Sequence, residues 1–242
     1  MRRRHLLSGL VSGMLAALSP TGRRARAADP TVDVLLVLAA DVSLSITEAR
    51  FDLERRGYAE AFSDPRVLRA IAEGPQGRIG VALFDWASPG EQRIAVDWMV
   101  IANGVDAGVF AARLAAAPRP FYGRTAIGSA IGFATALLAR APFQGDRRVI
   151  DISGDGTGNA GGPIAAAREA AVAAGATING IVILTDPEGM PGFLRDHTNP
   201  AGGLAAYYRT VVIGGAGAFV MSAASFEAFG RALIAKLVRE IS

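Results

Sequence analysis

The sequence contains no cysteine, so the protein can form neither disulfide bonds nor thiolate metal sites and has no cysteine nucleophile. Lysine is almost as scarce, because Lys236 is the only one among 25 basic residues. Histidine occurs only at His5 and His197. Chemistry that needs an amine or an imidazole must therefore use one of these three side chains.

Of the 242 residues, 51% are hydrophobic and 19% are charged, a balance typical of a folded domain. The charges are unevenly distributed, because no acidic residue precedes Asp29. Six of the 25 basic residues precede Asp29, namely Arg2, Arg3, Arg4, Arg23, Arg24 and Arg26. Without them, 19 basic and 22 acidic side chains remain, and the net charge changes from +3 to −3. A net positive charge would be the main argument for nucleic-acid binding, and it is lost when the N-terminal segment is removed.

The basic N-terminal segment has the features of an export signal. Its arginines precede an apolar stretch over residues 6–18, which is followed by Pro20 and a small-x-small cleavage site at residues 25–27. The apolar stretch is shorter than the ~20 residues that span a bilayer. An uncleaved anchor or a basic arm is the alternative.

Residues 3–7, Arg-Arg-His-Leu-Leu, resemble a twin-arginine export signal. We therefore expect a signal peptide over residues 1–27 and a single mature domain over residues 28–242. The protein should then be periplasmic or secreted, with no stable membrane insertion after cleavage.

From Asp33 onward, short apolar runs alternate with amphipathic stretches, which predicts an α/β fold with a doubly wound, Rossmann-like, mostly parallel sheet and helices on both faces. The 78–87 and 93–101 strands are too close for a helical crossover and should form an antiparallel hairpin. The other strands are predicted over residues 34–40, 148–153, 177–184 and either 210–213 or 218–221. Helices are predicted over residues 48–72 with a break at Asp64-Pro65, 106–116, 126–139, 163–174 and 225–241. A Pro/Gly-rich loop over residues 186–203 and one turn over residues 204–209 complete the pattern.

Oxygen-bearing side chains alternate directly after the first predicted strand, in Asp41-Val-Ser43-Leu-Ser45. In an extended chain this spacing directs all three to one side. Carboxylate and hydroxyl oxygens suit Mg²⁺, Mn²⁺ or Ca²⁺ rather than Zn²⁺ or Cu²⁺. The alternative is that Ser45 or Thr47 caps the next helix while Asp41 accepts backbone hydrogen bonds.

Topology favours the metal interpretation, because doubly wound sheets bind ligands beyond the carboxyl ends of strands, where the winding reverses. If the 148–153 strand lies beside the first strand, Asp41 and Asp155 face each other across that crevice. The irregular loop before Ala126 can bring Thr125 to the same place, although Thr125 could instead cap the following helix.

Three motifs thus occur in order: Asp41-x-Ser43-x-Ser45, a Gly-Arg-Thr125 before a helix, and Ser-Gly-Asp155-Gly after a buried strand. Together they resemble the von Willebrand factor A (vWA) domain with its metal-ion-dependent adhesion site (MIDAS), over the chain from about residue 33 to 242. The chain is also similar to a subfamily of small exported bacterial proteins of this kind. The predicted hairpin would supply the antiparallel edge strand typical of that fold.

The resemblance implies a divalent cation, Mg²⁺ or else Mn²⁺ or Ca²⁺, at a site made by these motifs. Ser43 and Ser45 would hold it directly, and Asp41, Thr125 and Asp155 would contribute directly or through water. A carboxylate from a protein partner would complete the coordination, in agreement with the tendency of Mg²⁺ to share its ligands with a partner.

The sequence departs from the vWA pattern at two places. Leu44 stands where a glycine is common, which puts bulk beside the metal. The third motif is Ser-Gly-Asp rather than Thr-Asp-Gly, so Asp151 competes with Asp155 as the ligand, although Asp151 lies inside the strand and is the more structural candidate.

Four further residues are candidates for the rim of the site. Two follow the second strand, Asp85 and Trp86, and two lie in the 186–203 loop, Asp186 and His197. The competing interpretation is that they are solvated loop residues beside a half-buried tryptophan.

Three classes of enzyme are disfavoured because the residues or motifs that they need are missing or misplaced. A phosphatase of the haloacid dehalogenase class could use Asp41 as its nucleophile, but Ser43 stands where its general acid belongs and its lysine could only be Lys236, in the closing helix. A serine hydrolase would have only His197 as its base, with no G-x-S-x-G motif beside it. A dinucleotide fold would need a glycine-rich turn after the first strand.

The sequence therefore predicts an exported, non-enzymatic, metal-dependent protein-binding module of the adhesion type. One alternative is a structural scaffold with a vestigial metal site, which would bind partners through its hairpin or its 186–203 loop. The least favoured alternative is a Mg²⁺-dependent phosphoesterase that uses Asp41.

Overall fold

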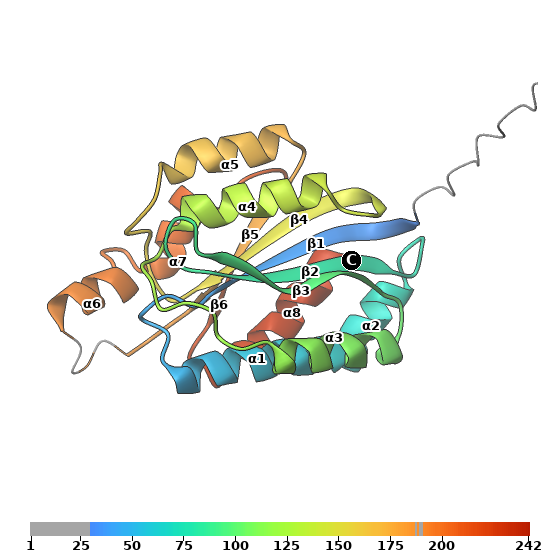
Figure 1. The fold of residues 1–242 in the computed structure, drawn as a ribbon, viewed down its shortest axis with the longest axis horizontal. Helices are drawn as coiled ribbons and strands as arrows, with labels where there is room; N and C mark the ends of the chain where they lie inside the picture. The colour runs from blue at the N-terminus through green and yellow to red at the C-terminus, as the bar shows by residue number, and fades with distance from the viewer. Residues whose placement is uncertain (1–29, 187, 189–190) are drawn as a thin grey trace, which may run out of the picture.

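The computed structural model describes residues 30–186, 188 and 191–242. The predicted signal peptide over residues 1–27 lies outside these residues. Figure 1 shows a central sheet with helices on both of its faces. Within the described part of the chain, no helix is long and apolar enough to cross a membrane.

Six strands form the sheet in the order β3-β2-β1-β4-β5-β6. Neighbouring strands run parallel except β2 and β3, which form an antiparallel hairpin with β3 at the edge. The strands are β1 Thr31–Asp41, β2 Ile79–Trp86, β3 Gln92–Ile101, β4 Gln144–Gly154, β5 Thr177–Ile183 and β6 Val220–Ala223. The predicted α/β class, the mostly parallel sheet and the antiparallel edge strand are confirmed.

Two layers of helices cover the sheet (Figure 1). One face is covered by α1 Glu48–Ser63, α2 Pro65–Ala72, α3 Gly104–Ala116 and α8 Phe229–Ile241. The other face is covered by α4 Ile127–Ala139, α5 Ile164–Ala173 and α7 Leu204–Tyr207. The predicted helix break occurs because Asp64 accepts a hydrogen bond from the Arg66 amide and Pro65 starts α2.

β1 packs against the helix layers on both faces of the sheet. All its residues after Thr31 are buried, as its continuous apolar run predicts for a strand with helices on both faces. Leu36 and Leu38 pack in the core under α1, α3 and α8, whereas Val37 and Ala39 pack in the core under α4 and α5. This burial fixes the position of Asp41, the last residue of β1, at the carboxyl end of the sheet.

Three sequence predictions need correction. The predicted loop over residues 186–203 contains a short helix, α6 Gly192–Thr198. Residues 210–213 lie mostly in a π-helical turn, Tyr208–Val212, so the last strand is β6, which overlaps the second predicted alternative. The closing helix begins at Phe229 rather than Ser225, because residues 225–228 form a turn in which Ser225 Oγ accepts a hydrogen bond from the Ala228 amide.

A buried ion-pair cluster fastens α8 to the sheet. Lys236 is fully buried, and its Nζ lies 2.7 Å from Oδ1 of Asp151 in β4 and also pairs with Glu240. Asn179 of β5 donates a hydrogen bond of 2.7 Å to the same Glu240 carboxylate. Burial and the nearby Glu240 carboxylate raise the pKa of Asp151 to about 7. The only lysine of the chain is therefore buried between α8 and β4, in a structural position.

Candidate functional site

The loop after β1 holds the first group of predicted site residues. The backbone amide of Ser43 donates a 2.8 Å hydrogen bond to Oδ1 of Asp41, which folds the loop back over the strand end. The hydroxyls of Ser43 and Ser45 lie 3.2 Å apart. Thr47 accepts a hydrogen bond from the Arg50 amide and caps α1, so Ser45 is not the cap. All three motif side chains are buried.

Asp155 reaches this loop because β4 lies directly beside β1. Ser45 Oγ donates a 2.6 Å hydrogen bond to Oδ1 of Asp155. The other oxygen, Oδ2, lies 3.5 Å from Nη1 of Arg50, the nearest paired cation. The expected neighbourhood of the two strands is confirmed, and Asp41 and Asp155 meet at the carboxyl end of the sheet.

Thr125 comes from the loop before α4 and is buried in the same place. Its hydroxyl donates a 3.1 Å hydrogen bond to Ser43 Oγ. It does not cap α4, whose N-cap residue is Ala126 and has no side-chain cap. Asn159 holds the loop in position, since its Oδ1 accepts a 2.9 Å hydrogen bond from the Thr125 amide.

Asp41 and Asp155 are buried near each other, and their hydrogen bonds do not offset the cost of ionising both carboxyl groups. Burial, and then the charge of Asp155, raises the pKa of Asp41 well above its usual range. Burial also raises the pKa of Asp155 to about 6. Oδ2 of each carboxylate has no hydrogen-bond partner among the described residues. A bound cation would remove this electrostatic cost.

The donor atoms also have the spacing of metal ligands. An octahedral cation with bonds of about 2.1 Å places neighbouring ligands about 3.0 Å apart. Successive oxygens here are separated by 3.1 Å, 3.2 Å and 2.6 Å, in the order Thr125, Ser43, Ser45, Asp155. No group of three or more His, Cys, Asp or Glu side chains in the described ranges is arranged to hold a metal, so hydroxyls would have to supply part of the ligand set. The residues fit a hard divalent cation on these grounds.

The two departures from the vWA pattern have physical explanations. Leu44 is 73% exposed and points away from the site, while its amide donates to the carbonyl of Gly123. Gly154 is required by close packing, because a Cβ there would lie 2.6 Å from the Tyr208 hydroxyl and 3.0 Å from Oδ2 of Asp41. The Ser-Gly-Asp order thus keeps the backbone clear of the first carboxylate.

The four rim candidates have different positions. Asp85 and Trp86 do not lie on a rim: both are buried in β2, and Asp85 forms a 2.6 Å ion pair with Arg55. Asp186 is exposed after β5, and its Oδ1 accepts a hydrogen bond from the Glu188 amide. Trp86 is paired with Asp41 in the β1–β2 register, and among the four rim candidates in the described ranges only the His197 side chain lies within hydrogen-bond distance of a predicted site residue, Thr125.

Sequence reasoning did not identify several residues that surround the site. Arg50 lies beside Asp155, and Asn159 supports Thr125, as described above. Glu54 of α1 is a third buried carboxylate near the site, and it accepts a 2.7 Å hydrogen bond from Ser153. Burial raises the pKa of Glu54 to about 8. The glycine-rich segment around Asn159 was a usable signal, whereas a glutamate in an amphipathic helix gives none.

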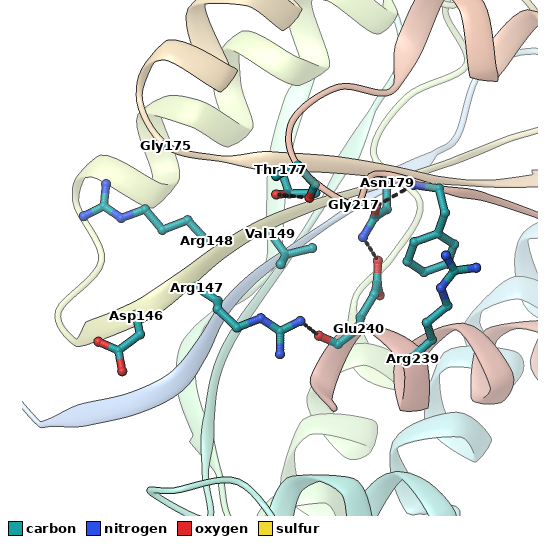
Figure 2. A pocket seen from close by; sticks show the side chains of 12 residues that line it. Asp146, Arg147, Arg148, Val149, Gly175, Thr177, Asn179, Gly217, Arg239 and Glu240 are labelled. Atoms are coloured by element: carbon teal, nitrogen blue, oxygen red, sulfur yellow. Dashed lines mark hydrogen bonds between the residues drawn. The ribbon is translucent and has the colours of Figure 1, made fainter.

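A separate cavity of about 360 Å³ lies at the opposite end of the sheet, among the first residues of β4 and β5 and the end of α8 (Figure 2). Its prominent polar side chains already bind other parts of the protein: Arg147 donates to the carbonyl of Ile241, and Asn179 to Glu240. Arg239 stacks on Phe219, with 3.8 Å between its guanidinium carbon and the ring centroid. This cavity does not include any of the predicted site residues.

Comparison with known proteins gives a family and a fold. Residues 31–242 match the family described as "Protein of unknown function (DUF1194)". No curated protein matches the chain at a significant level.

Several solved structures are similar to the chain. Proximal thread matrix protein 1 from the mussel byssus, with a zinc-occupied MIDAS motif, has 16% identity and a TM-score of 0.56 over 87% of this chain and 48% of its own. The pilus adhesin SpaC from Lactobacillus rhamnosus GG has 15% identity and a TM-score of 0.56 over 89% and 31%, respectively. A von Willebrand factor type A protein from Catenulispora acidiphila has 13% identity and a TM-score of 0.54 over 87% and 43%. The chain spans less than half of each of these structures, and the similarity establishes a vWA-like fold.

Proposed function

The chain belongs to the DUF1194 family and has a vWA-like fold, and from this premise we propose that it is an exported, non-catalytic protein-binding module with a divalent cation at a MIDAS-type site. Ser43, Ser45 and Thr125 would hold the cation through their hydroxyls. Asp41 and Asp155 would contribute directly or through water. When bound, the cation supplies a positive charge that accepts a carboxylate from a protein partner.

The observation that carries the proposal is the pair of buried carboxylates, each with one oxygen that accepts no hydrogen bond from the described residues. The Ser43 amide donates a hydrogen bond to Asp41, and the Ser45 hydroxyl donates one to Asp155. A bound cation would stabilise the ionised form of both carboxyl groups, whereas a neutral ligand would not. The oxygen donors favour Mg²⁺, Mn²⁺ or Ca²⁺.

The arrangement of the other reactive groups supports a binding role over catalysis. Lys236 is paired with Asp151 and Glu240 inside the fold, so it is not available to a nucleophilic Asp41. The similar structures include a pilus adhesin and a thread matrix protein. These features favour the adhesion-type hypothesis over the phosphoesterase hypothesis.

We also propose that residues 1–27 are a signal peptide, of the twin-arginine type, and that residues 28–242 are the mature domain. The charge distribution described above supports this division. The mature protein would then meet its partners in the periplasm or outside the cell.

Calorimetric titration with Mg²⁺ and Mn²⁺ tests the metal site. We expect binding by the purified protein, loss of binding in Asp41→Ala, and unchanged binding in the control Asp52→Ala, which alters an exposed aspartate of α1. Partner capture that is lost in EDTA and in Asp41→Ala would support the full proposal.

The second candidate is a scaffold with a vestigial site. It is favoured by Arg50, whose guanidinium lies 3.5 Å from Asp155 and offers an alternative positive charge. In that case neither metal binds, Arg50→Ala destabilises the protein, and EDTA leaves partner capture intact.

A further inference from the structure

His197 lies at the candidate metal site although it belongs to none of the three motif loops. It is carried by α6, in the connection that follows β5. Its Nε2 lies 3.3 Å from Oγ1 of Thr125. A Cβ on Gly156, the residue after Asp155, would lie 2.1 Å from the same nitrogen. The imidazole therefore lies directly over the backbone that presents Asp155 and beside the Thr125 hydroxyl.

The spacing of Nε2 continues the series of oxygen donors. Thr125 Oγ1, Ser43 Oγ and Ser45 Oγ follow one another at 3.1 Å and 3.2 Å, and Nε2 lies at 3.3 Å from the first of them. Neighbouring ligands of an octahedral cation are about 3.0 Å apart. The imidazole nitrogen thus stands at ligand spacing from a hydroxyl that belongs to the proposed site.

The other ring nitrogen has the partner that a metal-binding histidine needs. A metal on Nε2 requires the ring hydrogen on Nδ1, and Oγ1 of Thr157, 3.3 Å from Nδ1, can accept that hydrogen. Asn159 Nδ2 lies farther from Nδ1, at 3.5 Å. The Thr157 amide also donates to the carbonyl of His197, so the ring and its backbone are held together. Such an outer partner, which fixes the tautomer and the ring orientation, usually accompanies metal-ligating histidines.

From this geometry we infer that His197 is a nitrogen ligand of the proposed metal site and makes it select borderline transition ions such as Zn²⁺ over Mg²⁺. The inference rests on the proposed function, because it assumes a cation among Ser43, Thr125 and Asp155. It reverses the preference that the oxygen donors alone predict. Imidazole favours Zn²⁺, whereas Mg²⁺ favours oxygen ligands.

The test compares the Zn²⁺ and Mg²⁺ affinities of the whole chain with those of His197→Ala and His197→Gln. The control is Asp196→Ala, which removes an exposed potential ligand from the same helix. We expect the Zn²⁺ affinity of both His197 variants to fall by at least about tenfold, since loss of a supporting residue alone costs 10–100-fold. The Mg²⁺ affinity should change by less than about twofold.

A second measurement needs no variant at position 197. In protein labelled with ¹⁵N-histidine and carrying His5→Gln, Zn²⁺ should shift the Nε2 resonance of His197, and Mg²⁺ should not. An unchanged Zn²⁺ to Mg²⁺ ratio in the variants, together with an unshifted ring, would overturn the inference and leave the metal site intact. Absence of binding by either ion in the unaltered protein would instead overturn the proposed function.

Discussion

Ser45 donates its hydroxyl hydrogen to Asp155 over 2.6 Å, and this contact joins the loop after β1 to the loop after β4. The bond satisfies one carboxylate oxygen and leaves Oδ2 of Asp155 and Oδ2 of Asp41 without a hydrogen-bond partner among the described residues. The two strand ends therefore hold two carboxyl groups that burial makes costly to ionise, as their raised pKa values indicate. The protein should consequently respond to cations in its stability as well as in binding.

The first prediction concerns that stability. A cation that binds only the folded state at 100 times its Kd should raise the free energy of unfolding by about 2.7 kcal/mol. Thermal unfolding with and without Mg²⁺, Mn²⁺ and Zn²⁺ measures the effect. EDTA should reverse it, and Asp155→Ala should abolish it. Equal melting temperatures in all conditions would argue against the site.

The second prediction separates stability from binding at Asp41. Asp41→Asn removes the carboxyl group whose ionisation burial and Asp155 disfavour, while its Oδ1 can still accept a hydrogen bond from the Ser43 amide. The metal-free variant should be more stable by about 1 kcal/mol, which corresponds to a rise in Tm of about 2–4 °C. Metal binding should be lost. Asp52→Asn, on the exposed side of α1, is the control and should change neither quantity.

The third prediction concerns the glycine of the Ser-Gly-Asp motif. Gly154→Ala would place a methyl group 2.6 Å from the Tyr208 hydroxyl, so the protein should lose about 1–3 kcal/mol of stability and bind metal more weakly. Tyr208→Phe removes that hydroxyl and should restore part of the loss in the double variant. Gly162→Ala meets nothing within 4 Å and serves as the matched control. Denaturant unfolding and metal titration measure both effects, and a fully tolerated Gly154→Ala would contradict the packing argument.

The fourth prediction concerns the buried lysine. Lys236→Met leaves Asp151 and Glu240 in the core without their cation, which should cost about 3–5 kcal/mol of unfolding free energy. Adding Asp151→Asn to the same protein should recover part of the loss, because one uncompensated carboxylate disappears. Chemical denaturation of the two variants gives the comparison. If the double variant is no more stable than Lys236→Met, the ion pair does not account for the loss.

The fifth prediction concerns pH. The pKa of Asp151 is about 7 in the folded protein, mainly because of burial, and about 3.9 in an unfolded chain. The folded state therefore binds more protons between these values, and the contribution of Asp151 to stability should decline as the pH rises from about 4 to 7. Asp151→Asn should flatten the dependence of unfolding free energy on pH in that window. Asp146→Asn, an exposed position of the same strand, should leave the slope unchanged.

Strong periodicity made most of the fold predictable from the sequence. The apolar run of β1, the break at Asp64-Pro65 and the short link in the β2–β3 hairpin each reflect a local rule that the structure obeys. Prediction from the sequence was wrong where the local pattern did not indicate a helix, as at α6. α6 lies in a segment rich in proline and glycine, and its contacts with the loops of the candidate site depend on tertiary structure.

The candidate site was predictable in part for a similar reason. Asp41 and Asp155 follow buried strands, so their meeting required only that β1 and β4 be neighbours. The burial of Asp85 and its pairing with Arg55 required knowledge of how α1 packs on β2, which no sequence pattern contains. Glu54 and Lys236 were hidden for the same reason, because a charged residue in an amphipathic helix is ordinarily expected at the surface.

The burial of Lys236 also has a practical consequence for labelling. The chain has no other lysine, and this side chain is fully buried, so an amine-directed reagent can reach only the N-terminal amino group while the protein is folded. Coupling by this chemistry would attach the folded protein to a biosensor surface at a single point. Unfolding would expose a second reactive amine, so a mass spectrum with two labels per chain would count the molecules that had opened.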